Sequence, residues 1–426
     1  MSEVTTATAS AEPTGSMEVT KVTKESWKCL LAAFAGWALD AMDWMLLALA
    51  LPMIAEEFGS GMGAMGLLGT MTLLGAAVSG LFVGVLADKL GRVKMLMFTM
   101  IFYAVMTALC GFAQSYMQLL VLRFFTGIGL GGEWGVGAAL ITETWPAKWR
   151  AWATSTVHSG FPVGYGLASL AYMYIAPTWG WRYLFFLGIL PAFVAIWIRL
   201  SVGEPEAWKA SKNKPKEEQP KMPLAMLFQG IYLKRTIFAS LLAGGALMAY
   251  WGMGTWVPTY LVKTKGLDIM RSGTFLLLLN FGGICGHQTF GYLSGRWGRR
   301  ASMLLGIGSA TLATLVYVVI DDPNTLFWFG WVFGWATYGF FGTFGAYLSE
   351  LYPVEARATG ASFTFNAGRA LSMLSPYLIG IAANAYGLAV GLGLTAVFNA
   401  IAMLALLMLP ETRHLAISSE GEKAVK

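Results

Sequence analysis

The chain has 426 residues, of which 12% are charged and 56% hydrophobic, and its mean hydropathy is +0.60. Soluble domains carry about 25% charged residues, so this composition excludes a soluble globular protein. Apolar runs recur along the chain, and a run of about 20 residues can cross a ~30 Å hydrocarbon layer as a helix. A transmembrane barrel would instead alternate apolar and polar residues. The composition therefore predicts an all-α, multi-pass membrane protein.

The net charge of +6 does not indicate nucleic-acid binding, because the basic residues are spread over short loops and form no single patch. Cys29, Cys110 and Cys285 lie far apart within apolar runs, which fits neither a disulfide framework nor a metal site. The sequence has no evident nucleotide-binding loop or catalytic nucleophile motif. We therefore expect no enzyme activity, no metal, no cofactor and no ATP-driven step.

The apolar runs fall into two sets of six. Residues 1–28 are polar and are expected to form a disordered tail, and a polar segment rich in Lys and Pro covers 202–234. The first six runs lie at about 29–55, 65–87, 94–113, 116–145, 150–176 and 181–201. The other six lie at about 235–262, 272–295, 299–320, 325–351, 357–386 and 388–410. The predicted architecture is 12 transmembrane helices in two bundles, 29–201 and 235–410, joined by the linker 202–234 and followed by a tail, 411–426.

The distribution of Lys and Arg predicts the orientation. If both termini are cytoplasmic, 22 of the 29 basic residues lie on the cytoplasmic side. The opposite side then carries four: Arg182, Lys263, Lys265 and Arg271. Under the positive-inside rule, both tails and the linker are expected to be cytoplasmic, with the protein in a bacterial inner membrane.

An internal repeat relates the two halves at a constant offset of 207 residues. Three groups of residues in the first half recur at this offset in the second half; Gly91 and Gly298, for example, are equivalent. The paired groups are Gly84, Gly91 and Arg92 with Gly291, Gly298 and Arg299; Gly127 and Gly132 with Gly334 and Gly339; and Glu143, Pro146 and Arg150 with Glu350, Pro353 and Arg357. Because each copy holds an even number of spans, the two bundles should be parallel repeats related by an axis along the membrane normal.

Residues 84–92, Gly-Val-Leu-Ala-Asp-Lys-Leu-Gly-Arg, resemble the loop signature G-x-L-A-D-x-x-G-R of the major facilitator superfamily. The resemblance extends over residues 29–412. Segments 129–135, 143–146 and 179–191 are similar to the sialate:proton symporter family, which also contains lactate and other monocarboxylate permeases. This resemblance implies the major-facilitator fold and import of an organic acid together with protons.

Acidic residues inside the spans are candidates for proton coupling. A charged side chain at the bilayer centre costs at least ~2.5 kcal/mol and needs a partner, a water cavity or a function. Asp40 and Asp43 share one helix face and would repel each other if both were ionised. We expect Asp40, Asp43 and Glu133 to handle protons. The alternatives are permanent pairing of the aspartates with Arg123 or Arg369 and, for Glu133, simple helix packing.

Arg369 is the candidate anchor for the substrate, because its planar guanidinium suits a carboxylate. Asn366 lies three residues earlier on the same helix face. Pairing that only holds helices together is the alternative. Further candidates for the substrate site are Asn280, His287 and Gln288, which form a polar stripe, and Tyr250 and Tyr338. Most of the 17 Trp and 16 Tyr are expected at the membrane interfaces.

The loop motifs at the predicted cytoplasmic corners are candidates for gating or for stabilising one conformation. Simple anchoring at the water interface is the alternative. The residues concerned are Asp88, Arg92, Gly84, Gly91, Glu143, Arg150, Glu350 and Arg357.

These observations favour a monomeric secondary transporter that imports an organic anion with protons by rocking two bundles about a central site. The anion could be a monocarboxylate such as lactate or pyruvate, a sugar acid or an aromatic acid. The alternatives are a membrane sensor that binds organic acids without transporting them, and a uniporter or drug antiporter on the same scaffold. The expected partners are the acid, protons and the lipid bilayer, and the proton gradient is the expected energy source.

Overall fold

The computed structural model describes residues 21–131, 141, 144–146, 153, 156–201, 203, 223–352 and 357–412. Throughout these residues the regular secondary structure is helical, and eight of the helices are long and apolar enough to cross a membrane. Taken together, the helices cover all or part of each of the twelve predicted spans. The structure therefore confirms the predicted all-α membrane fold.

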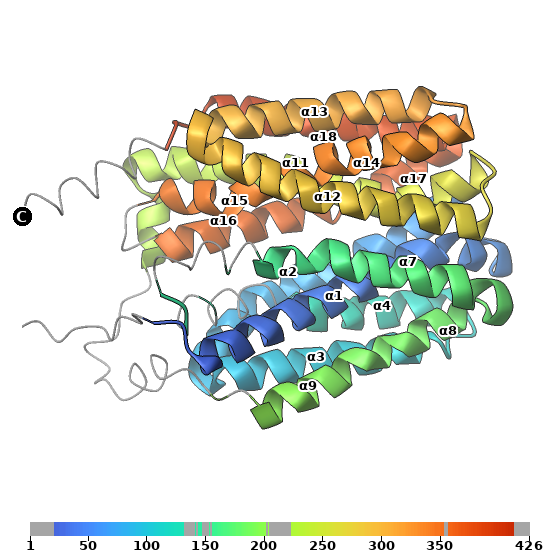
Figure 1. The fold of residues 1–426 in the computed structure, drawn as a ribbon, viewed down its shortest axis with the longest axis horizontal. Coiled ribbons are helices and arrows are strands. Elements are labelled where there is room, and N and C mark those ends of the chain that lie inside the picture. Colours follow the sequence, from blue (N-terminus) through green and yellow to red (C-terminus); the bar gives the residue numbers. More distant parts are fainter. Residues whose placement is uncertain are drawn as a thin grey trace, which may run out of the picture.

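The helices of the first half are α1 (Lys24–Glu57), α2 (Met62–Leu90), α3 (Arg92–Cys110), α4 (Tyr116–Leu130), α7 (Gly160–Trp179), α8 (Trp181–Phe186), η1 (Leu187–Ile189) and α9 (Leu190–Ser201). Those of the second half are η3 (Pro223–Phe228), α11 (Gly230–Lys263), α12 (Ile269–Trp297), α13 (Arg299–Val319), α14 (Pro323–Gly339), α15 (Phe341–Glu350), α16 (Arg357–Ser372), α17 (Ser375–Tyr386) and α18 (Leu388–Leu407). In Figure 1 the two halves form two bundles, one above the other, with their helices along the long axis of the molecule.

Two α-helices, α1 and α11, begin inside segments predicted to be irregular, as does the short 3-10 helix η3. Lys24 starts α1 within the predicted tail 1–28, because Thr23 and Ser26 form a capping box in which each side chain accepts the other residue's backbone N–H, both at 3.1 Å. Gly230 starts α11 within the predicted linker 202–234. Both helices have 34 residues, and at 1.5 Å per residue each is longer than the hydrocarbon layer requires.

The internal repeat appears as the same helix contact in both bundles. Gly127 of α4 packs so closely on α2 that a Cβ there would collide with the carbonyl oxygen of Thr72. Gly334 of α14 packs in the same way on the carbonyl oxygen of Leu279 in α12. Both members of the second pair lie 207 residues after those of the first. Small residues allow this close backbone approach, so the sequence repeat is also a structural repeat.

The two ends of the bundles can be told apart by their turns. We call the end with the turns near residues 59, 112, 180, 266 and 387 the distal end, and the end with residues 21–23, Gly91, Gly298 and 408–412 the terminal end. At the terminal end Gly91 and Gly298, with φ of 120° and 107°, precede α3 and α13. These are backbone conformations that favour glycine.

The bundles contact each other at the distal end. The backbone N–H of Met62, the first residue of α2, donates to Asn384 Oδ1 of α17 at 3.0 Å. Gly66 lies against the carbonyl of Pro376, and Gly273 of α12 lies against Met173 of α7. The distal end is therefore closed in this structure.

Candidate transport site

Asp43 forms an ion pair inside the first bundle. Its Oδ2 accepts from Arg123 Nη2 at 3.3 Å, and both side chains are fully buried. Arg123 Nε also donates to Thr72 Oγ1 at 3.3 Å, and its guanidinium lies 5.7 Å from the centre of the Phe185 ring. Three helices of one bundle thus hold Arg123, and Asp43 supplies its counter-charge.

Arg369 lies at the boundary between the bundles. It is 7% exposed, although it belongs to α16 of the second bundle, and its Nη1 donates to the carbonyl oxygen of Gly131, at the end of α4, at 3.1 Å. Its guanidinium also lies 5.5 Å from the centre of the Phe365 ring. Asp40 is 1% exposed in the middle of α1, in the other bundle. The two bundles thus bury an acid and a base, and the base contacts the backbone of the bundle that holds the acid.

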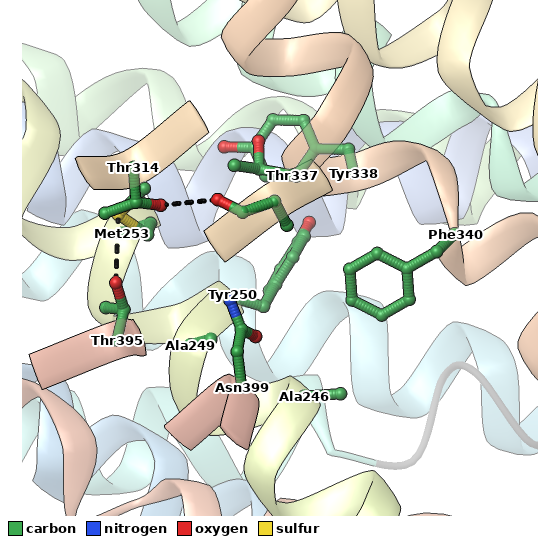
Figure 2. A pocket seen from close by; sticks show the side chains of 11 residues that line it. Ala246, Ala249, Tyr250, Met253, Thr314, Thr337, Tyr338, Phe340, Thr395 and Asn399 are labelled. Carbon is green, nitrogen blue, oxygen red and sulfur yellow. Dashed lines mark hydrogen bonds between the residues drawn. The ribbon is translucent and has the colours of Figure 1, made fainter. Parts of the chain in front are cut away.

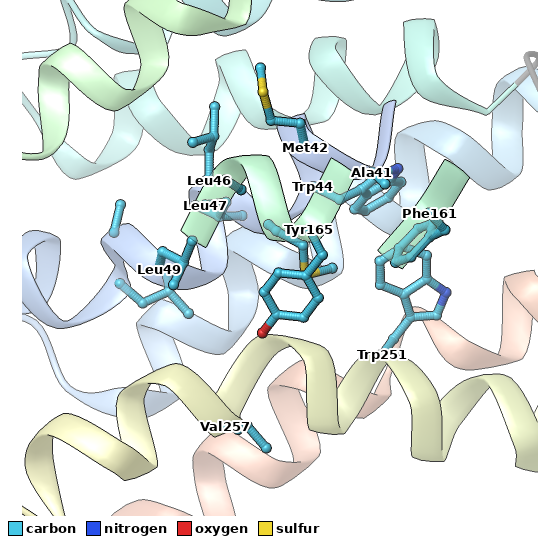
Figure 3. Close-up of a cluster of buried hydrophobic side chains, with 14 of the residues drawn as sticks. Ala41, Met42, Trp44, Leu46, Leu47, Leu49, Phe161, Tyr165, Trp251 and Val257 are labelled. Atoms are coloured by element: carbon cyan, nitrogen blue, oxygen red, sulfur yellow. The ribbon is translucent and has the colours of Figure 1, made fainter. Parts of the chain in front are cut away.

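Aromatic rings from both bundles pack beside these charges. The rings of Trp44 in α1 and Trp251 in α11 lie 4.4 Å apart, and Phe161 of α7 stands edge-on to Trp251 at 6.2 Å. Tyr250 contacts Phe161 at 5.6 Å and Tyr338 at 5.1 Å. Figure 3 shows Trp44, Phe161 and Trp251 gathered where α1, α7 and α11 meet. We refer to Asp40, Trp44, Phe161, Tyr250, Trp251 and Arg369 as the central interface.

Several buried polar atoms around the central interface have no hydrogen-bond partner among the described residues. Such atoms usually find one in a folded protein. They are Trp37 Nε1, Tyr165 Oη, Trp251 Nε1, Asn280 Oδ1 and His287 Nδ1. They come from α1, α7, α11 and α12, so both bundles contribute groups that a polar ligand or water can satisfy.

The three residues of the predicted polar stripe on α12 differ in their exposure to solvent. Asn280 is 3% exposed and its amide donates to the carbonyl of Leu276 at 2.7 Å. His287 is partly buried, whereas Gln288 is exposed.

Asn366 of α16 is half-buried, and its amide donates to the carbonyl of Ser362 at 3.0 Å. A Cβ at Gly80 of α2 would lie 3.0 Å from the Oδ1 atom of Asn366. Asn366 therefore lies near the opposite bundle, as Arg369 does.

A small cavity lies behind Tyr250 and Tyr338, inside the second bundle. Its volume of ~10 Å³ suits about one water molecule. Figure 2 shows Tyr250, Tyr338 and Asn399 around it, and Asn399 Oδ1 is buried without a hydrogen-bond partner among the described residues. The two tyrosines thus separate this cavity from the central interface.

The predicted corner residues are described in part. Glu350 pairs with Arg299 of the same bundle at 3.1 Å and accepts from Thr412 Oγ1 at 2.6 Å. Gly84 lies within α2. The side chains of Asp88, Arg92 and Arg357 lie outside the described residues, as do Glu133, Glu143 and Arg150 altogether.

Sequence reasoning missed Trp44 and Trp251, which were expected with most tryptophans at the membrane interfaces. They are instead 8% and 7% exposed, at the boundary between the bundles. The available signal was their spacing, because they lie 207 residues apart and Trp44 follows Asp40 by one helical turn.

The structure has two helical repeats with buried charged residues where the repeats meet. This architecture is typical of secondary membrane transporters. The family model of the Major Facilitator Superfamily matches residues 33–365 and 288–426. The chain belongs to this superfamily.

Full-length relatives are also transport proteins. The chain is 32% identical to the "Probable 4-methylmuconolactone transporter" of Cupriavidus pinatubonensis, over 94% of this chain and 93% of that protein. It is 31% identical to the cis,cis-muconate transport protein of Acinetobacter baylyi, over 88% and 91%. It is 28% identical to the sialic acid transporter NanX of Escherichia coli, over 88% and 92%, which agrees with the resemblance seen in the sequence.

A solved structure supports the fold. A bacterial homologue of the human lysosomal transporter Spinster, in an inward-facing and unoccupied conformation, has a TM-score of 0.72 and 21% identity, covering 91% of this chain and 98% of that chain. The similarity in fold agrees with the predicted major-facilitator architecture.

Proposed function

We propose that the protein imports a small organic acid together with protons, by alternating access. The observation that carries this proposal is the buried Arg369 of the second bundle, which donates to the backbone of the first bundle at Gly131, while the first bundle buries Asp40 in α1. Such a base can bind a carboxylate, and such an acid can bind a proton. Their interaction provides a way to couple the two ligands.

The coupling follows from competition for Arg369. A buried guanidinium needs a counter-charge, because an uncompensated charge in a low-dielectric interior is costly. When Asp40 is ionised it supplies that charge, and when Asp40 is protonated a substrate carboxylate can supply it. Proton binding at Asp40 therefore favours anion binding at Arg369, and by linkage the anion favours the proton to the same extent.

Asp43 has a different part in this mechanism. Its contact with Arg123 lies inside one bundle and is fully buried, so rocking of the bundles leaves it unchanged. We assign Asp43 to the structure of the first bundle and Asp40 to proton coupling.

The proposed orientation assigns the two ends of the molecule to the two sides of the membrane. With both termini cytoplasmic, the closed distal end faces the outside of the cell. This structure is then a state closed to the outside.

The substrate we propose is an unsaturated or aromatic acid. The rings of Phe161, Tyr250 and Trp251 surround the central interface, and flat conjugated molecules pack well against such rings. Two relatives are named as transporters of muconate and of methylmuconolactone. Both are small unsaturated organic molecules.

The test is uptake into proteoliposomes with an imposed pH gradient, using labelled benzoate and cis,cis-muconate. The wild-type protein should accumulate at least one acid, and Asp40→Asn should abolish accumulation while exchange of internal for external acid persists. Wild-type accumulation by Asp40→Asn would contradict the proton assignment. A sensor would bind an acid and never accumulate it.

Binding to purified protein tests Arg369 directly. Truncating one partner of a desolvated charge pair costs about 2 to 5 kcal/mol, so Arg369→Ala should weaken acid binding roughly 30-fold or more. Arg369→Lys should restore affinity in part, since lysine keeps the charge and loses the planar fork. Arg271→Ala is the control, because Arg271 is 73% exposed. Unchanged affinity in Arg369→Ala would show that this residue does not hold the acid.

A further inference from the structure

Trp44 and Trp251 occupy equivalent positions in the two repeats and meet across the boundary between the bundles. They lie 207 residues apart in the sequence. Their ring centres are 4.4 Å apart, with a tilt of 43° between the ring planes. Because both side chains are more than nine-tenths buried, the pair lies in the interior of the molecule, away from lipid and bulk water.

Trp251 carries a hydrogen-bond donor that nothing described in the structure satisfies. Its Nε1 is buried and has no acceptor among the described residues. Phe161 stands edge-on to the same indole and Trp44 packs on its face, so the ring is held in place. A buried N–H group without an acceptor is unfavourable in free energy, and a hydrogen bond to an oxygen of a ligand would remove this cost.

The two indole nitrogens lie on the same side of the tryptophan pair. In Figure 3 the nitrogens of both indoles lie on the side of the pair where Ala41 and Phe161 lie, away from Leu49. Along α1, Asp40 precedes Trp44 by four residues, which places both on one helix face about 6 Å apart along the axis. Trp44 therefore lies on the face of α1 that carries Asp40.

We infer that Trp251, supported by Trp44, is a second anchor of the substrate site and binds an oxygen at the far end of the acid. This inference rests on the proposed function, because it takes Arg369 as the anchor for the first carboxylate. The substrate class is therefore an acid that carries a second hydrogen-bond acceptor, a carboxylate or a carbonyl, in addition to its first carboxylate.

The test compares two probes that differ at one end. trans,trans-Muconate and sorbate share the same six-carbon diene, and sorbate has a methyl group in place of the second carboxylate. Calorimetry on the purified protein should show tighter binding of muconate than of sorbate. Trp251→Phe, which keeps an aromatic ring and removes the N–H, should weaken muconate binding roughly tenfold or more and leave sorbate binding within about twofold.

Trp328→Phe is the matched control, because the Trp328 side chain of α14 is 65% exposed and is not part of the central interface. Its change to Phe should leave the binding of both acids unchanged. A selective loss of muconate binding in Trp328→Phe, an equal loss of both acids in Trp251→Phe, or no muconate binding by the wild-type protein would each overturn the inference.

Arg369→Ala separates this inference from the proposed function. It should weaken both probes, because both carry the first carboxylate. If Arg369→Ala behaves in this way and Trp251→Phe binds muconate as the wild-type protein does, the second anchor is wrong and the proposed function stands. If Arg369→Ala binds both acids normally, the proposed function fails, and the inference about Trp251 fails with it.

Discussion

Arg123 and Arg369 are both buried, but Arg123 lies in the same bundle as Asp40 and Asp43, whereas Arg369 lies in the other bundle. Asp43 and Arg123 belong to the same bundle and are in contact at 3.3 Å. Asp40 and Arg369 belong to different bundles, and in the proposed mechanism their charges compensate each other. A movement of one bundle against the other preserves the first interaction and changes the second. This difference is the physical basis for separating a structural acid from a coupling acid.

Asp43→Asn should lower the stability of the protein. The change leaves the Arg123 guanidinium buried without a counter-charge, which typically costs about 3 to 5 kcal/mol. The apparent melting temperature of the purified protein in detergent should therefore fall.

The double variant Asp43→Leu with Arg123→Met provides the control, because replacing a buried ion pair by apolar residues is often neutral or stabilising. It should recover most of the lost melting temperature. If the single and double variants melt at the same lowered temperature, the two residues do not stabilise the bundle as a pair.

The repeat explains which helices can approach each other closely. Gly75 of α2 lies against the carbonyl of Phe124 in α4, and Gly282 of α12 lies against that of Trp331 in α14. These residues again differ by 207 in number. Close backbone contact is a major source of helix association in membranes, where the hydrophobic effect between helices is absent. The glycines of α2, α4, α12 and α14 therefore help to hold each bundle together.

Gly127→Ala and Gly334→Ala should each destabilise the protein, since the added Cβ would collide with a backbone carbonyl that cannot move freely. Overpacking of this kind typically costs about 1 to 3 kcal/mol. Gly308→Ala in α13 is the matched control, because a Cβ there meets nothing within 4 Å and alanine favours a helix by roughly 0.5 to 1 kcal/mol. Melting temperatures in detergent should fall for the first two variants only. A fall of equal size in Gly308→Ala would show that collision with the backbone carbonyls does not decide the result.

The sequence predicted the helices and the repeat well because both depend on local composition and on spacing. Apolar runs define spans, and a constant offset shows which residues are equivalent. Equivalence does not show contact, however. The offset relates Trp44 to Trp251, but only the packing of α1 against α11 shows that their rings meet. In the same way, Asp40 and Asp43 differ little in sequence, and only the position of Arg123 on α4 shows that Asp43 forms an ion pair with it.

At the scale of the whole molecule, the two bundles meet at the distal end through backbone and small side chains. Met62 donates to Asn384, and Gly66 lies against Pro376. These contacts bury few charges, so they can open and close at modest cost. Alternating access requires that they separate in the state that binds substrate from the distal side.

A reversible cross-link across the distal end should therefore stop transport. Gly63 and Asn384 suit this test, because a Cβ at Gly63 would lie 3.2 Å from Asn384 Nδ2. The variant carries Gly63→Cys and Asn384→Cys together with Cys285→Ser, while Cys29 and Cys110 are buried and remain. A short bifunctional thiosulfonate should join the two new cysteines and abolish uptake into proteoliposomes, and a reductant should restore uptake.

Each single-cysteine variant treated with the same reagent should keep its transport activity. This control distinguishes cross-linking from simple modification of one cysteine. Full uptake by completely cross-linked protein would mean that this end does not open during transport, and that the acid enters by another route.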